Sequence, residues 1–172
     1  MTAFTIAIDD EQVLAALARL RRRTDNLGPV LKAIGEDLVE STKQRFATGA
    51  GPDGTPWAAN SAVTISRYLG LTKGNYKKDG ELSKKGATRL GAKKPLTGET
   101  LSLGSQIRYQ VRGNVLEVGS SMEYAAMQQF GGTKAQFPNL WGDIPARPFL
   151  GLSAADKAAI DETIAEYLDL LK

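Results

Sequence analysis

The sequence lacks two residue types on which much enzyme chemistry depends. Its 172 residues include no cysteine and no histidine. Without cysteine there is no thiolate nucleophile, disulfide, iron–sulfur cluster or cysteine-ligated zinc. Without histidine there is no imidazole ligand for a metal and no usual general base near neutral pH. Catalysis would have to use carboxylates, lysine, tyrosine or a Ser–Lys pair, so we expect no catalytic residues and no cofactor.

Two short motifs have chemical interpretations that their positions do not favour. Residues 49–54, Gly-Ala-Gly-Pro-Asp-Gly, match G-x-G-x-x-G, but a dinucleotide site needs a strand before the motif and a helix after it. Here the motif follows a predicted helix, so it predicts consecutive turns. The acidic run Asp9, Asp10 and Glu11 begins a predicted helix, where carboxylates interact favourably with the helix dipole, so we expect no metal site. A hydrolase built on two distant carboxylates stays an alternative.

A basic stretch is the strongest candidate for binding. Residues 67–94 contain nine basic and two acidic residues, a net charge of +7, whereas the other residues carry 13 basic and 17 acidic ones, a net charge of −4. Clustered cations can follow a nucleic-acid backbone, and aromatic side chains add stacking on single strands. Tyr68 and Tyr76 lie in the stretch, and Trp57 precedes it. Non-specific DNA contact is therefore one alternative, and a solvated loop or a protein partner is the other. The contact candidates are Lys73, Lys77, Lys78, Lys84, Lys85, Arg89, Lys93 and Lys94.

Hydrophobic spacing predicts the N-terminal elements. Alternation from Phe4 to Ile8 predicts a short half-buried strand. Asp9 with Gln12 is a capping-box pattern for a first helix, and Gly28-Pro29 begins a second helix that ends at Gly49. The predicted buried stripe of the first helix is Val13, Leu14, Leu17 and Leu20, and that of the second is Leu31, Ile34, Leu38, Thr42 and Arg45 or Phe46.

The middle and C-terminal parts follow different patterns. Residues 49–94 are rich in Gly, Pro and Lys, with few large apolar side chains, which predicts a long loop or arm. Gly113-Asn114 predicts a hairpin turn in which Arg112 pairs with Val115. A short helix over residues 123–129 stops at Gly131-Gly132, and Ser153 with Asp156 caps a last helix. The stripe of that last helix is Ile160, Ile164, Tyr167, Leu168 and Leu171.

These elements predict an α+β fold. Three main helices pack on a small antiparallel sheet, with a long basic loop in the middle. We expect one domain over residues 1–172, with its core in about 1–48 and 95–172. No apolar run approaches the length of a membrane span, and the N-terminus lacks the pattern of a secretory signal.

Aromatic, glycine and proline residues form an ordered series of motifs. The series runs from Pro52-Asp53-Gly54-Thr55-Pro56-Trp57 through Leu96-Thr97-Gly98, Val118-Gly119, Tyr124-Ala125-Ala126 and Gln129-Phe130-Gly131-Gly132 to Ile144-Pro145-Ala146-Arg147-Pro148-Phe149-Leu150-Gly151-Leu152. Taken alone, Tyr124, Phe130 and Phe149 are candidates for the core. Arg147 is a candidate to pair with a carboxylate across an interface or to stack on an aromatic ring.

In its motif order the chain resembles the phage virion-morphogenesis family, the tail-completion proteins of Mu-like and P2-like phages and prophages. The resemblance covers the chain from about residue 30 to the end. It implies a structural protein that completes the tail or joins it to the head through other tail or head–tail connector proteins. It also implies a homo-oligomeric ring, assembly in the host bacterial cytoplasm and a place in the virion tail. The interface candidates that it implies are Trp57, Tyr124, Gln129, Phe130, Gly131, Arg147, Pro148 and Phe149.

Overall fold

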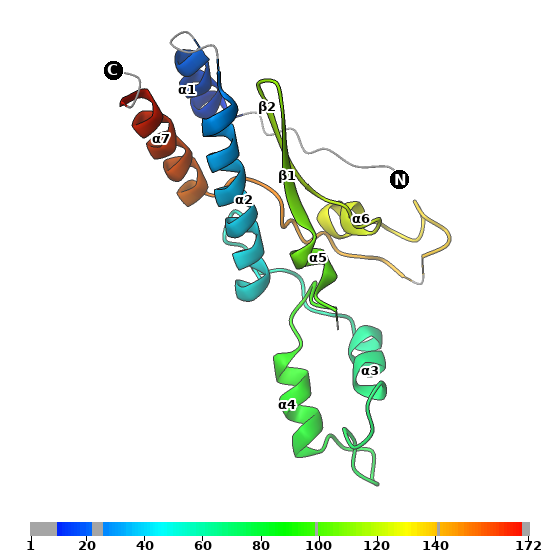
Figure 1. Ribbon diagram of the computed structural model, residues 1–172. Coiled ribbons are helices and arrows are strands. Elements are labelled where there is room, and N and C mark those ends of the chain that lie inside the picture. The colour runs from blue at the N-terminus through cyan, green and yellow to red at the C-terminus, as the bar shows by residue number, and fades with distance from the viewer. Residues whose placement is uncertain (1–9, 22–25, 99, 141, 170–172) are drawn as a thin grey trace.

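The computed structural model describes residues 10–21, 26–98, 100–140 and 142–169, and the predicted strand at Phe4–Ile8 lies outside them. Figure 1 shows an elongated molecule, with a body of helices and one hairpin at one end and a two-helix arm at the other. We call residues 61–94 the arm and the other described residues the body. The mixture of helices with a two-stranded antiparallel sheet confirms the predicted α+β class. The elements in order are α1 (Glu11–Arg21), α2 (Gly28–Thr48), α3 (Ala62–Gly70), α4 (Lys84–Ala92), α5 (Ser102–Ser105), β1 (Ile107–Arg112), β2 (Val115–Ser120), α6 (Ala125–Phe130) and α7 (Ala154–Asp169).

Helix α2 is the centre of the body. It has Pro29 in its first turn and ends where Gly49 adopts a φ of 74°, as predicted. It packs against α7 on one side and against the hairpin on the other. A first hydrophobic cluster, which we call the helix cluster, joins these elements and consists of Leu27, Val30, Leu31, Ile34, Ile160 and Ile164.

Helix α1 differs from the predicted helix in two details. Its cap is Asp10, whose Oδ1 accepts the N–H groups of Gln12 (3.1 Å) and Val13 (3.3 Å), while the predicted cap Asp9 lies outside the described residues. Leu14 was expected in the buried stripe but is 49% exposed. The reason is that α1 packs chiefly against α7, so its buried face is narrower than its apolar pattern.

The hairpin has the predicted register. Arg112 pairs with Val115, Val111 with Leu116 and Tyr109 with Val118, and Gly113 adopts a φ of 58° in the turn. The sheet approaches α2 closely at Gly35, where a Cβ atom would lie 2.5 Å from the Tyr109 ring. Gly35 therefore allows the sheet to pack directly on the helix backbone.

A second hydrophobic cluster, which we call the junction cluster, lies where the arm leaves the body. It consists of Phe46, Trp57, Leu103, Ile107, Ala125, Phe149 and Leu150. Trp57 falls in the segment 49–94 that was predicted to lie outside the core, yet it is only 6% exposed. The core boundary is corrected accordingly, because the chain makes a turn after α2 that returns Trp57 to the body before the arm begins.

The arm is more regular than the predicted loop. Two helices, α3 and α4, lie side by side in it (Figure 1), and each has a serine cap. The Ser61 and Ser83 hydroxyls accept the N–H groups of Thr64 and Gly86 at 3.2 and 3.1 Å. The amide of buried Asn75 donates to the carbonyl of Leu69 at 2.6 Å, which fixes the connection between the helices. Hydrogen bonds thus order a segment whose apolar content predicts a loop.

The C-terminal part follows the prediction. Helix α6 stops at Gly131, which has a φ of 71°. Before α7, the N–H of Asp156 donates to Ser153 Oγ (3.1 Å) and the N–H of Ser153 donates to Asp156 Oδ2 (2.7 Å), which completes the predicted capping box. Tyr167 and Leu168 pack on the helix cluster, while Leu171 lies outside the described residues. None of the helices in the described ranges has the length and apolarity that crossing a membrane requires.

Candidate assembly interface

Four of the eight interface candidates are buried in the body. Phe149 is 0% exposed, Trp57 and Gln129 are 6% exposed, and Arg147 is 7% exposed. Phe149 and Trp57 both pack on Phe46, with ring centroids 5.6 and 5.3 Å apart. The Trp57 indole N–H also donates to the carbonyl of Pro148 at 2.7 Å. In this chain these side chains contact other parts of the same chain, and an interface role for them stays a prediction.

Gln129 fastens α6 to the segment that leads into α7. Its Oε1 accepts the N–H groups of Phe149 (2.9 Å) and Leu150 (3.0 Å), and its Nε2 donates to the carbonyl of Leu150 (3.0 Å). The side chain thus replaces a strand neighbour for two consecutive residues of extended chain. A buried backbone needs such partners, because an unpaired polar group there costs about 1–3 kcal/mol.

Arg147 fastens the same segment to the base of the arm. Its Nε and Nη2 donate to the carbonyls of Ala58 (2.7 Å) and Ala59 (2.9 Å). Burial lowers the pKa of this guanidinium, but arginine stays charged because its ordinary pKa is so high. Arg147 therefore binds carbonyls of its own chain, and a carboxylate or aromatic partner across an interface stays a prediction. The nearby Gly131 could not carry a side chain, since a Cβ atom there would lie 2.6 Å from the backbone nitrogen of Ala146.

A buried ion pair that sequence analysis missed completes this framework. Arg45 of α2 pairs with Asp156 of α7, and its Nη1 also donates to the carbonyls of Phe149 (2.8 Å) and Gly151 (2.9 Å). Burial raises the pKa of Asp156, but its bonds from Ser41, Ser153 and Arg45 outweigh burial and lower that pKa overall. The only sequence signals were an arginine in an apolar stripe and the acid of the capping box.

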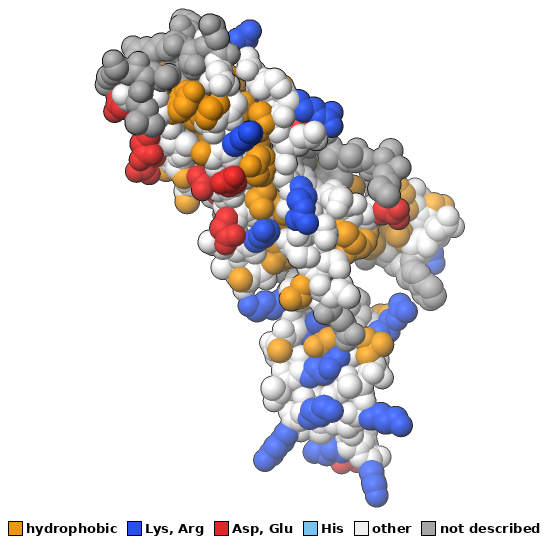
Figure 2. Space-filling model, viewed as in Figure 1, with side chains coloured by type: hydrophobic (Ala, Val, Ile, Leu, Met, Phe, Trp, Pro, Cys, Tyr) orange, Lys and Arg blue, Asp and Glu red, His pale blue; other side chains and the backbone are white. Residues whose placement is uncertain are grey.

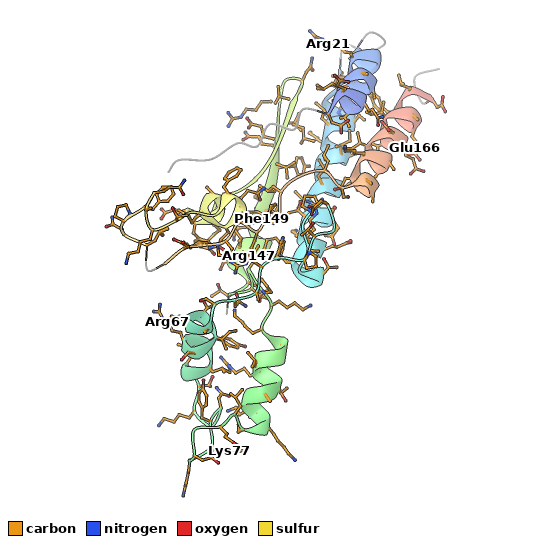
Figure 3. The ribbon with its side chains drawn as sticks, turned by 180° about the vertical axis from the view of Figure 1, so that it is seen from behind. Arg21, Arg67, Lys77, Arg147, Phe149 and Glu166 are labelled. Atoms are coloured by element: carbon orange, nitrogen blue, oxygen red, sulfur yellow. The ribbon has the colours of Figure 1, made fainter. Side chains whose placement is uncertain are left out.

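The rigid framework leaves other motif residues at the surface. Tyr124, just before α6, is 44% exposed, Phe130, the last residue of α6, is 61% exposed, and Phe137 in the following loop is 47% exposed. Beside them lies a groove of about 690 Å³ between the body and the base of the arm. Figure 3 shows Arg147 and Phe149 at this junction of body and arm. Apolar residues of both parts line the groove, among them Val63, Leu96, Tyr124, Leu140, Ile144 and Pro145.

The basic residues gather on the arm, as Figure 2 shows. Several have partners within it: Arg89 and Lys93 lie over the Tyr68 ring, 4.3 and 4.8 Å from its centroid. Lys77 pairs with Glu81 at 2.7 Å, Lys85 donates to the carbonyl of Lys73 at 3.0 Å, and Lys94 donates to the carbonyl of Ala47. Within the part of the chain that the structure describes, the exposed side chains of Lys73, Lys78 and Lys84 have no such partner.

The described residues give little support to a dinucleotide site, a metal site or a hydrolase that uses two carboxylates. The glycine-rich segment forms a closed turn, in which Asp53 Oδ1 accepts the N–H of Thr55 (3.0 Å) and Ala50 pairs with Pro56. Asp10 caps α1 and pairs with Lys157. Asp156 is the one carboxylate in the described ranges that is fully buried, and its oxygens are occupied by the pair and cap above. Those ranges contain no cluster of three acidic residues that could hold a metal ion.

Comparison with known proteins agrees with the motif series. A family model described as the phage virion morphogenesis family matches residues 8–169. The chain belongs to this family. It is 29% identical over 161 residues to the Mu-like prophage FluMu G protein 2 of Haemophilus influenzae, an alignment that covers 94% of this chain and 92% of that protein. No solved structure was found to match the chain.

Proposed function

We propose that this phage virion morphogenesis protein acts in tail completion or head–tail joining, through contacts with copies of itself and with other phage proteins and without catalysis. Its family and its Mu-like prophage relative support a role in phage assembly. The observation that carries the proposal is the difference between the motif residues that are buried and those that are exposed. Gln129, Arg147 and Phe149 are used inside the chain, and they hold the exposed aromatic side chains of Tyr124 and Phe130 beside an open groove.

Such an arrangement suits protein docking. Exposed aromatic residues on a rigid support bury a large area at a low entropic cost when a partner covers them. The groove next to them is lined by polar as well as apolar side chains. We propose that the protein assembles as a ring in the host bacterial cytoplasm and remains in the virion tail.

Deletion of the gene from an inducible phage or prophage tests this function. We expect electron microscopy of the lysate to show filled heads and tails that are separate or defective, and a plasmid copy of the gene to restore joined particles. Infectious particles formed at normal numbers without the gene would refute the proposal.

DNA binding by the arm is the second candidate, and the net charge of +7 on residues 67–94 is the observation that favours it. Of the three aromatic residues expected to stack on single-stranded DNA, the structure leaves Tyr76 exposed, at 45%, but not the other two. Trp57 is buried, and a face of Tyr68 is covered by Arg89 and Lys93, so neither ring is a free platform on which a base can stack.

A further inference from the structure

The arm is basic, and helix α7 at the far end of the molecule is acidic. Figure 2 shows lysine and arginine over the arm, and aspartate and glutamate near α7 at the far end. In Figure 3, Lys77 at the tip of the arm and Glu166 on α7 mark these ends. Helix α7 contains five acidic residues and one lysine, and that lysine, Lys157, is paired with Asp10 of α1.

The outer face of α7 is acidic and unpaired. Asp161, Glu162 and Glu166 are exposed. Glu162 and Glu166 share a face because they are four residues apart, and Asp161 directly precedes Glu162. Among the described residues, none of these three carboxylates has an ion pair or a side-chain hydrogen bond. The helix therefore presents a row of like charges whose mutual repulsion a cationic partner would relieve.

The arm holds its lysines in fixed places. Asn75 is 1% exposed and binds the carbonyls of Leu69 and Thr72. Helix α4 lies so close to this residue that a Cβ atom on Gly86 would be 2.1 Å from the backbone carbonyl oxygen of Asn75. Lys73, Lys78 and Lys84, the lysines of the described arm whose side chains have no partner, all lie on or next to this ordered tip. A fixed array of cations is suited to a specific partner rather than to general solvation.

We propose that the basic arm of one copy docks on the acidic outer face of α7 of a second copy. The arm cannot reach α7 of its own chain, because the two lie at opposite ends of the molecule (Figure 1). The contact is therefore head-to-tail: each subunit uses its arm on one neighbour and offers α7 to another. Such heterologous contacts close into a ring or continue as a helical stack. This inference rests on the proposed assembly function and names the surfaces through which the copies meet.

Site-directed cross-linking of the full chain tests the contact without virions. The natural chain has no cysteine, so each single variant carries one thiol. Ala87→Cys places it on α4, three residues after Lys84, and Ala165→Cys places it between Glu162 and Glu166, both at exposed positions. We expect a short bis-maleimide to join these two variants in about 0.01 M salt and to fail in about 1 M salt, where the Debye length falls from about 30 Å to about 3 Å.

A matched control and a charge exchange make the result specific. Val115→Cys is at the exposed hairpin tip and is expected to cross-link poorly with Ala87→Cys. Adding Glu162→Lys and Glu166→Lys to the α7 variant is expected to lower the yield about tenfold, if each lost pair is worth a surface ion pair. Adding Lys78→Glu and Lys84→Glu to the arm variant is then expected to restore it.

Three results would overturn the inference: equal cross-linking to Val115→Cys, no cross-linking at any salt concentration, or no restoration by the charge exchange. A DNA titration distinguishes docking on a second copy from binding to DNA. If the arm binds duplex DNA with a log–log salt slope of about −3, as expected for three lysines on phosphates, and the cross-links show no preference for α7, the arm binds DNA instead. All of these outcomes are independent of whether the gene is needed for tail completion.

Discussion

At the scale of single residues, the framework around Phe149 depends on polar groups that are fully paired. Arg45, Gln129 and Arg147 together bind carbonyls or N–H groups of residues 58–59 and 149–151. Gln129 and Arg147 are interface candidates by their place in the motif series, whereas their bonds within the chain are not readable from the sequence. Their partners lie 20 to 89 residues away along the chain, and no local pattern encodes contacts of that separation.

Asp156→Asn tests the buried pair. Removing the carboxylate leaves Arg45 charged and buried, so we expect the free energy of unfolding near neutral pH to fall by about 3 kcal/mol. Asp161→Asn, on the exposed face of α7, is the matched control and is expected to change stability little. Urea unfolding measures both. Equal stability of the two variants would show that the Arg45–Asp156 pair does not support the fold.

The same variant has a predicted pH dependence. The pKa of Asp156 is lowered in the folded protein, so its ionisation stabilises the fold at pH values above its ordinary pKa of 3.8. That contribution is lost as the pH falls through the lowered value. The difference between the natural chain and Asp156→Asn is therefore expected to be full near neutral pH and to shrink in acid. A difference that grows with acidification would contradict the assigned shift.

At the scale of elements, the sequence predicts best where local signals agree. The Gly113-Asn114 turn and the alternation around it predict the hairpin register, and Ser153 with Asp156 predicts the start of α7. The arm was harder because α4 contains Gly86 and Gly91, and glycine in a helix costs about 1 kcal/mol relative to alanine. Serine caps at residues 61 and 83 and the buried Asn75 outweigh that weak propensity. The caps were readable signals, but the contact between Asn75 and Gly86 was not.

A pair of glycine variants tests whether the close packing of α4 on Asn75 orders the arm. Gly86→Ala puts a methyl group 2.1 Å from the backbone carbonyl oxygen of Asn75, whereas the methyl group of Gly91→Ala, in the same helix, meets no atom within 4 Å. We expect Gly86→Ala to speed hydrogen exchange and tryptic cleavage in residues 62–92, and Gly91→Ala to slow them, because alanine favours the helix. If both variants behave like the natural protein, the arm is not held as described.

At the scale of the whole molecule, the basic and acidic residues that are unevenly distributed along the sequence also lie apart in space. The excess of cations in residues 67–94 lies on the arm, and the acids of α7 lie at the opposite end (Figure 2). We propose that body and arm form one domain, because Trp57 and Leu103, which stand before and after the arm, both belong to the junction cluster. The sequence predicts the polarity, but the distance between the charged ends depends on the helical arm.

The central claim is that exposed surfaces of this chain assemble a virion, and complementation of a phage that lacks the gene tests it most directly. The double variant Tyr124→Ser and Phe130→Ser changes only exposed aromatic side chains, with Val115→Ser at the hairpin tip as its control. We predict that the double variant remains folded but leaves heads and tails unjoined in electron micrographs, while the control restores joined particles. Joined particles at the natural level with the double variant would contradict the account.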